Sequence, residues 1–110
     1  MEPSIYEIRA MEQPIYEIRV MDYPYFLDKD NFPSCGIRER VGFYYEEKTA
    51  IRAVKENWCD IQDCYARAAE IREVEPGLYP KENIIHYYLW NHDERKFEET
   101  LIPYFDGFIL

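Results

Sequence analysis

The sequence predicts an α+β fold, in which a mostly antiparallel sheet of four to six strands carries one main helix and one short helix on one face. Three observations support this class. Apolar and polar residues alternate along several segments, and a single long segment, at about 46–58, has helical periodicity. Only one strand-helix-strand crossover is available, which is too few for a doubly wound parallel sheet. We expect residues 1–110 to form a single domain.

The first twenty residues are two ten-residue units in tandem, MEPSIYEIRA and MEQPIYEIRV, which match at seven of ten positions. The alternation within each unit predicts strands at Ile5–Ala10 and Ile15–Met21, and Pro14 marks the break between them. Two arrangements follow from this pattern. Either both units form strands, as a hairpin or as two edge strands, or one unit docks and the other is an extra edge strand or an appended arm.

Residues 22–36 contain Pro, Asp, Asn, Ser and Gly at short intervals and predict a loop, whose aromatic side chains we expect to pin it to the core. The alternation at Arg38–Tyr45 predicts a strand. The main helix, at about 46–58, begins with acidic residues that complement the helix dipole and buries an apolar stripe. A short second helix, capped by Asp60, is expected to follow.

Three more strands are predicted in the second half of the chain, at Ala68–Val74, Ile84–Trp90 and Lys96–Leu101. The segment Ile84–Trp90 is apolar on both faces, so we expect it in the interior of the sheet. A polar turn then returns the last strand antiparallel to it. The apolar residues 103–110 are expected to pack on the core or to meet a partner.

The formal net charge of −9 limits the classes of molecule that this protein is expected to bind. Such a chain repels phosphate backbones, so direct nucleic-acid binding is not expected, whereas a basic protein partner would be steered towards it. Two interpretations remain: the charge serves solubility, or its carboxylates mimic phosphates on the surface of a nucleic-acid-handling enzyme.

Cysteine usage and the N-terminal sequence predict a cytoplasmic protein. The three cysteines have no framework spacing, and the chain starts without the basic and apolar regions of a signal peptide. No run approaches eighteen apolar residues, so no membrane span is expected. Two cysteines and two histidines lack the spacing of a zinc site, and we expect neither a metal nor a cofactor; these residues are Cys59, Cys64, His86 and His92.

Motifs for catalysis are missing from the sequence. The four glycines form no phosphate loop, and neither Ser4 nor Ser34 lies in a nucleophile elbow. His86 falls inside a predicted strand, which favours a structural histidine over a catalytic base. We therefore expect no catalytic residues; a small enzyme that joins His86 or a cysteine to carboxylates remains the third hypothesis.

The aromatic content, with eleven Tyr, six Phe and two Trp, indicates a contact surface. The first hypothesis is a non-enzymatic protein-binding module whose exposed aromatic side chains have acidic neighbours. The alternative is a homo-oligomeric structural or regulatory domain, in which the duplicated edge strand pairs with a second chain to make a homodimer. The candidate contact residues are Tyr6, Tyr16, Tyr23, Tyr25, Tyr44, Tyr104 and Phe105, with Glu98, Glu99 and Asp106 as acidic neighbours.

A short motif offers another interpretation of the tandem units. Glu12-Gln13-Pro14-Ile15-Tyr16 resembles the Glu-Pro-Ile-Tyr-Ala phosphorylation motif of translocated bacterial effectors, with Glu17 in the place of Ala. The resemblance implies phosphotyrosine signalling. The alternation of each unit favours strand duplication instead.

A second resemblance extends over residues 15–110. It is carried by Gly42-Phe43-Tyr44, Ala50, Ala53-Val54, Asn57, Asp60-Ile61, Glu70, Gly77-Leu78-Tyr79-Pro80 and Tyr88-Leu89-Trp90-Asn91. These segments are similar to uncharacterised small acidic proteins of gut bacteria and their phages and mobile elements. The resemblance implies a cytosolic α+β domain and assigns no active-site residues. It also implies an accessory role such as an anti-CRISPR or anti-restriction inhibitor, whose partner is a host nuclease or CRISPR effector.

Overall fold

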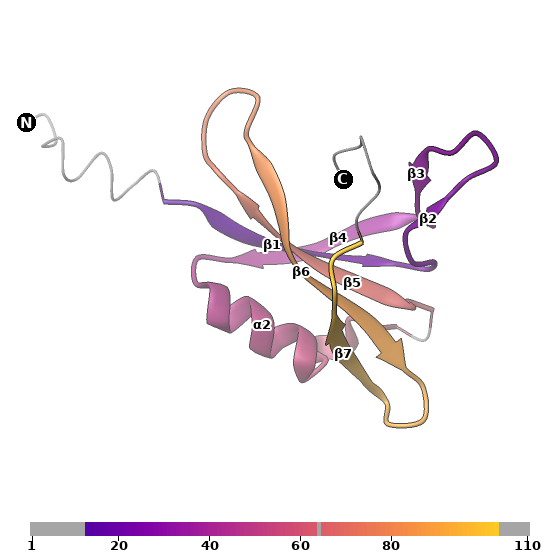
Figure 1. The fold of residues 1–110 in the computed structure, drawn as a ribbon. Coiled ribbons are helices and arrows are strands. Elements are labelled where there is room, and N and C mark those ends of the chain that lie inside the picture. Colours follow the sequence, from indigo (N-terminus) through magenta and orange to yellow (C-terminus); the bar gives the residue numbers. More distant parts are fainter. Residues whose placement is uncertain (1–12, 64, 104–110) are drawn as a thin grey trace, which may run out of the picture.

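The computed structural model describes residues 13–63 and 65–103, and its main feature is a five-stranded sheet (Figure 1). The strand order is β4-β1-β5-β6-β7, and every neighbouring pair is antiparallel. With one helix packed on the sheet, this confirms the predicted α+β class. The strands are β1 (Ile15–Met21), β4 (Arg38–Tyr44), β5 (Ala68–Val74), β6 (Glu82–Asn91) and β7 (Lys96–Thr100).

Helix α2 (Glu47–Lys55) covers one face of the sheet (Figure 1). Its buried side chains, Ala50, Ala53 and Val54, are small, which brings the helix close to the strands. The core between the two layers is completed by Ile18, Val20, Ile71, Tyr88 and Phe97, all 2 % exposed or less. The main helix is therefore where the periodicity predicts it.

The helix ends earlier than predicted, and no second α-helix follows it in the described residues. A 3₁₀ turn, η1 (Trp58–Asp60), takes its place. Asn57, Asp60 and Asp63 have left-handed φ values of 49°, 52° and 45°. A left-handed residue interrupts an α-helix, and Asn and Asp adopt this conformation more readily than most residues. The prediction of a short helix after Asp60 was wrong for this reason.

Strand β1 lies between β4 and β5, so the second ten-residue unit forms an interior strand and not an edge strand, which was one of the arrangements that the duplication allowed. Strands β4 and β5 run parallel to each other, and α2 connects them over one face, as a split β-α-β unit with β1 inserted. The first unit, with its predicted strand Ile5–Ala10, lies outside the described residues. Residues 104–110 lie outside them as well.

The predicted loop at 22–36 contains a small hairpin that the sequence did not reveal. Strands β2 (Phe26–Leu27) and β3 (Pro33–Ser34) pair as a separate two-stranded sheet, which projects beyond one end of the main sheet (Figure 1). Asp28 accepts hydrogen bonds from the backbone of Asp30 and Phe32. Its carboxylate therefore fixes the turn between these strands.

Of the aromatic residues at 22–36, Tyr25 holds the segment to the core as expected. Its hydroxyl contacts Glu70 at 2.9 Å, and its ring lies beside that of Tyr87. Burial raises the pKa of Tyr25, and the charge of Glu70 raises it further. Tyr23 and Phe32, by contrast, are 56 % and 55 % exposed.

The sheet face opposite α2 carries buried charges that alternate in sign. Glu17 and Arg19 of β1 stand opposite Arg72 and Glu70 of β5, and all four are at most 8 % exposed. Ion pairs join Glu17 to Arg19 and Glu70 to Arg72, and Glu82 of β6 contacts both arginines at 3.3 and 3.7 Å. The five residues form one network, in which each buried charge has an opposite partner.

The C-terminal hairpin agrees closely with the prediction. β6 is longer than the predicted Ile84–Trp90 at both ends, lies between β5 and β7 as its two apolar faces indicate, and pairs antiparallel with β7. Within the described ranges, no helix has the length and apolar character needed to cross a membrane.

Candidate protein-binding surface

Strand β4 forms one edge of the sheet, and in the described part of the chain it pairs only with β1. Six of its seven residues are exposed. Val41 and Phe43 are 40 % and 51 % exposed, and Tyr45, directly after the strand, is 68 % exposed. The rings of Phe43 and Tyr45 meet edge to face, with centroids 5.7 Å apart. An open backbone edge beside apolar side chains is a template for pairing with another chain.

Three hollows follow β4 on the side of the sheet that faces α2. The first, of about 520 Å³, lies beside Glu39 and Asp60, and the second, of about 200 Å³, lies at Gly42. The third, of about 620 Å³, lies beside Tyr45 and Glu47. We call β4 with these three hollows the β4 edge surface.

Gly42 opens the central hollow. It stands opposite Ile18 on the helix side of the sheet, and a Cβ atom built on it would have no heavy atom within 4 Å. The walls of the hollow include Ile18, Ala53 and Trp58, which are buried or half-buried. A side chain at position 42 would occupy this space, so glycine leaves an apolar hollow directly beside the open strand edge.

The two outer hollows are acidic. Glu39, Asp60 and Asp63 line the first hollow, whereas the guanidinium of Arg40, a further lining residue, contacts Glu17 on the other face of the sheet. The third hollow has two carboxylates, Glu46 and Glu47, and one cation, Lys48. The β4 edge surface is thus apolar at its centre and negative at both ends.

A short hydrogen bond fixes one of these carboxylates. The hydroxyl of Tyr65 donates to Glu39 at 2.6 Å. The bond to this carboxylate raises the pKa of Tyr65 to about 12. Tyr65 thereby ties the segment after η1 to the edge strand.

Two of the predicted contact residues border the β4 edge surface. Tyr16 and Tyr44 are opposite each other in register, on the side of the sheet that faces α2. Tyr44 is half-buried and packs edge to face on Trp58, with ring centroids 6.0 Å apart. Tyr16, also half-buried, lines the third hollow with Tyr45.

The other predicted contact residues do not gather there. Tyr23 and Tyr25 lie in the segment before β2, and the guanidinium of Arg67 lies 5.4 Å from the ring centroid of Tyr23. Glu98 and Glu99 belong to β7, at the opposite edge of the sheet from β4. Four predicted residues lie outside the described residues: Tyr6, Tyr104, Phe105 and Asp106.

The sequence pattern assigned Arg38–Tyr45 to a strand but did not identify its edge position or its hollow. Strict alternation places Val41, Phe43 and Tyr45 on one face, with Arg40 on the other. In the structure, the register with β1 shifts between Arg40 and Gly42, so Arg40 lies on the same face as Phe43. The lone glycine between apolar residues is the one signal of this irregularity in the sequence.

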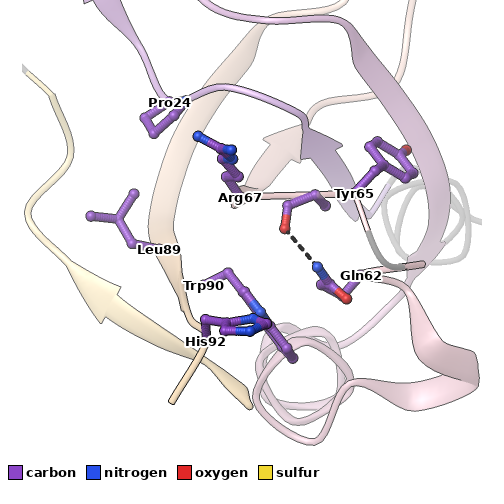
Figure 2. A pocket seen from close by; sticks show the side chains of 8 residues that line it. Pro24, Gln62, Tyr65, Arg67, Leu89, Trp90 and His92 are labelled. Carbon is purple, nitrogen blue, oxygen red and sulfur yellow. Dashed lines mark hydrogen bonds between the residues drawn. The ribbon is translucent and has the colours of Figure 1, made fainter. Parts of the chain in front are cut away.

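A further pocket, of about 490 Å³, lies beyond Tyr65, which also lines the first hollow. Figure 2 shows Arg67, Trp90 and His92 around it, with Gln62 donating to the backbone oxygen of Ala66 at 3.1 Å. This pocket is lined by a guanidinium, an imidazole and an indole ring, in contrast to the carboxylates beside β4.

Metal-ligating residues do not cluster in the described part of the chain, where no group of three or more His, Cys, Asp or Glu side chains could hold an ion. His86 lies between two carboxylates, 2.8 Å from Glu47 and 3.2 Å from Glu99. Both of its ring nitrogens therefore contact carboxylates. No protein-family model, curated protein or solved structure matches this chain.

Proposed function

We propose that this protein is a non-enzymatic, cytoplasmic protein-binding module that adds a strand of its partner to the open edge of β4. The single observation that carries the proposal is the combination, on one edge strand, of a backbone edge that no other strand of the described residues pairs with and an apolar hollow at Gly42. In strand addition, backbone hydrogen bonds supply affinity and pockets for alternate side chains supply specificity. Both parts are provided by the β4 edge surface.

The chemistry of this surface specifies the partner segment. An extended segment paired with β4 would place one apolar side chain in the hollow at Gly42. Side chains further along it would reach the outer hollows, where Glu39, Asp60 and Glu47 favour Lys or Arg. The expected partner is therefore an extended segment with an apolar residue between basic ones.

Basic segments of this kind occur where proteins bind phosphate backbones. Together with the net charge of −9, this supports a nucleic-acid-handling host enzyme, such as a nuclease or a CRISPR effector, as the partner. Occupation of its basic segment would inhibit the enzyme, as an anti-defence protein does. The phage or mobile-element accessory role implied by the sequence resemblance is part of the same proposal.

The test compares the wild-type chain with Gly42→Val as bait in host lysate, and then measures the affinity of each for the captured enzyme. Gly42 has no positive φ and a Cβ there meets no atom, so valine fills the hollow without strain. Leu78→Lys is the matched control, because Leu78 is 93 % exposed in the turn before β6.

The proposal expects a captured nucleic-acid-handling enzyme whose affinity falls at least about tenfold with Gly42→Val, a change of about 1.4 kcal/mol. Leu78→Lys should leave the affinity unchanged, and added salt should weaken it. Equal affinity of the wild type and Gly42→Val would overturn the assignment of the surface. If light scattering shows a homodimer that Gly42→Val dissociates, the alternative of a homo-oligomeric domain is correct instead.

A further inference from the structure

Because β1 is buried on both faces of the sheet, each face requires a particular kind of side chain. Ile18 and Val20 are at most 2 % exposed and belong to the core under α2. Glu17 and Arg19, which alternate with them, belong to the buried charge network on the other face. Because side chains alternate along a strand, a slip by one residue would move both charges into the core. A shift of the strand register by ten residues along the N-terminal sequence instead preserves this alternation, because the two ten-residue units are alike.

Residues 5–11 read IYEIRAM, and β1, at residues 15–21, reads IYEIRVM, so the two segments are identical at six of seven positions. The only difference is Ala10 in the place of Val20. Residues 5–11 lie outside the described residues, so this comparison concerns sequence alone. It shows that every residue type required by the core and by the charge network occurs twice, in the same order.

The charge network makes this match specific. Glu17 contacts Arg40 of β4 at 3.4 Å, and Arg19 contacts Glu82 of β6 at 3.3 Å. The first unit carries Glu7 and Arg9 at the equivalent positions. An arbitrary apolar segment in place of β1 would supply neither of these charge contacts.

We propose that residues 5–11 are a second sequence for the β1 position, and that the chain exchanges between two registers of its N-terminal strand, ten residues apart. In the second register, residues 12–21 join the strand to Asp22. A longer loop of this kind adds little to the free energy of closure. Val20 is fully buried, so its two extra methyl groups favour the described register, by roughly 10- to 100-fold.

A double-mutant cycle in the full chain tests the proposal, with Ile8→Asp, Ile18→Asp and the double variant. Unfolding in urea gives stability, and amide hydrogen exchange read by mass spectrometry identifies the protected segment. Ile8→Asp should have no effect on stability. Ile18→Asp should remain folded and monomeric, with protection moved from residues 15–21 to 5–11. The double variant should lose cooperative unfolding.

Three results would overturn the proposal: Ile18→Asp unfolds the chain as completely as the double variant, the double variant stays folded, or protection of residues 5–11 appears only in a dimer. The exchange variant Ala10→Val/Val20→Ala provides a second measurement that introduces no buried charge. It should move protection to residues 5–11 while Val20→Ala alone divides it between the segments. Protection that remains on residues 15–21 in the exchange variant would contradict the second register.

Discussion

Nε2 of His86 lies 2.8 Å from Oε1 of Glu47, and this contact joins strand β6 to the first turn of helix α2. The opposite ring nitrogen faces Glu99 of β7, so one imidazole links three elements. The His86 side chain is 17 % exposed. Its contact with Glu47 should therefore contribute measurably to the packing of the helix on the sheet.

A double-mutant cycle with His86→Ala and Glu47→Ala measures the contribution of this contact to the stability of the protein. We expect a coupling energy of about 0.5–1.5 kcal/mol in the free energy of unfolding, the usual range for a hydrogen bond. Urea denaturation at neutral pH measures it. Glu46→Ala is the control, since Glu46 makes no side-chain capping bond, and its effect should add to that of His86→Ala. If the effects of Glu47→Ala and His86→Ala on the free energy of unfolding are purely additive, the link between the two residues is contradicted.

Glu70→Gln should be the most destabilising conservative change in the charge network. Glu70 is fully buried and contacts Arg72 at 3.0 Å, so the amide would leave this guanidinium with less negative charge around it. Loss of one partner of a buried pair costs about 3 kcal/mol. Chemical denaturation measures the change. Glu98→Gln, at an exposed site on β7, should stay within about 0.5 kcal/mol of the wild type.

Tyr65 should titrate late in alkali, because its pKa is raised to about 12 by the hydrogen bond to Glu39. Because the pKa of Tyr65 is higher in the folded state than in the unfolded state, the interaction stabilises the fold fully below the unfolded pKa of about 10. This stabilisation is lost as the pH rises through the folded pKa of about 12. Glu39→Gln should return the Tyr65 titration towards 10, as followed by the NMR signal of its ring Cζ. An unchanged titration in this variant would show that Glu39 does not hold the hydroxyl.

Acid should loosen the β2–β3 hairpin through Asp28. The backbone N–H of Phe32 donates to its carboxylate, as do Asp30 and Ser34, and these bonds lower the pKa of Asp28. Because the pKa of Asp28 is lower in the folded state than in the unfolded state, its hydrogen bonds contribute stability above the unfolded pKa of about 3.9. This stability is lost as the pH falls through the lower pKa of the folded state. Hydrogen exchange of the hairpin amides should be faster in Asp28→Asn at neutral pH, and the difference from wild type should vanish in acid. A difference that persists at low pH would assign the effect to another group.

Local sequence patterns predicted most of the secondary structure because the strands alternate and α2 has one apolar stripe. Ile15–Met21 and Ala68–Val74 were predicted with the bounds that the structure shows. The pattern does not report the order of strands in the sheet. The interior position of β1 depends on α2 carrying the chain over it to β5, and this packing is non-local.

The candidate surface was harder to predict than the fold for a similar reason. Gly42 appears in the sequence as one of four scattered glycines. Its hollow is also lined by Ala53 and Trp58 on the helix side, and their position beside the strand depends on tertiary packing. Tyr16 and Tyr44 were selected for residue type alone, and their adjacency follows from the register of β1 with β4.

The insertion of β1 between β4 and β5 determines the order in which the chain can fold during synthesis. Ile18 pairs with Ile71, more than fifty residues later. On the ribosome, β1 therefore emerges long before one of its two neighbours exists, although β4 follows it closely. The early β1–β4 ribbon exposes apolar side chains until α2 and β5 are made. Completion of the sheet should consequently be slow relative to that of proteins dominated by local contacts.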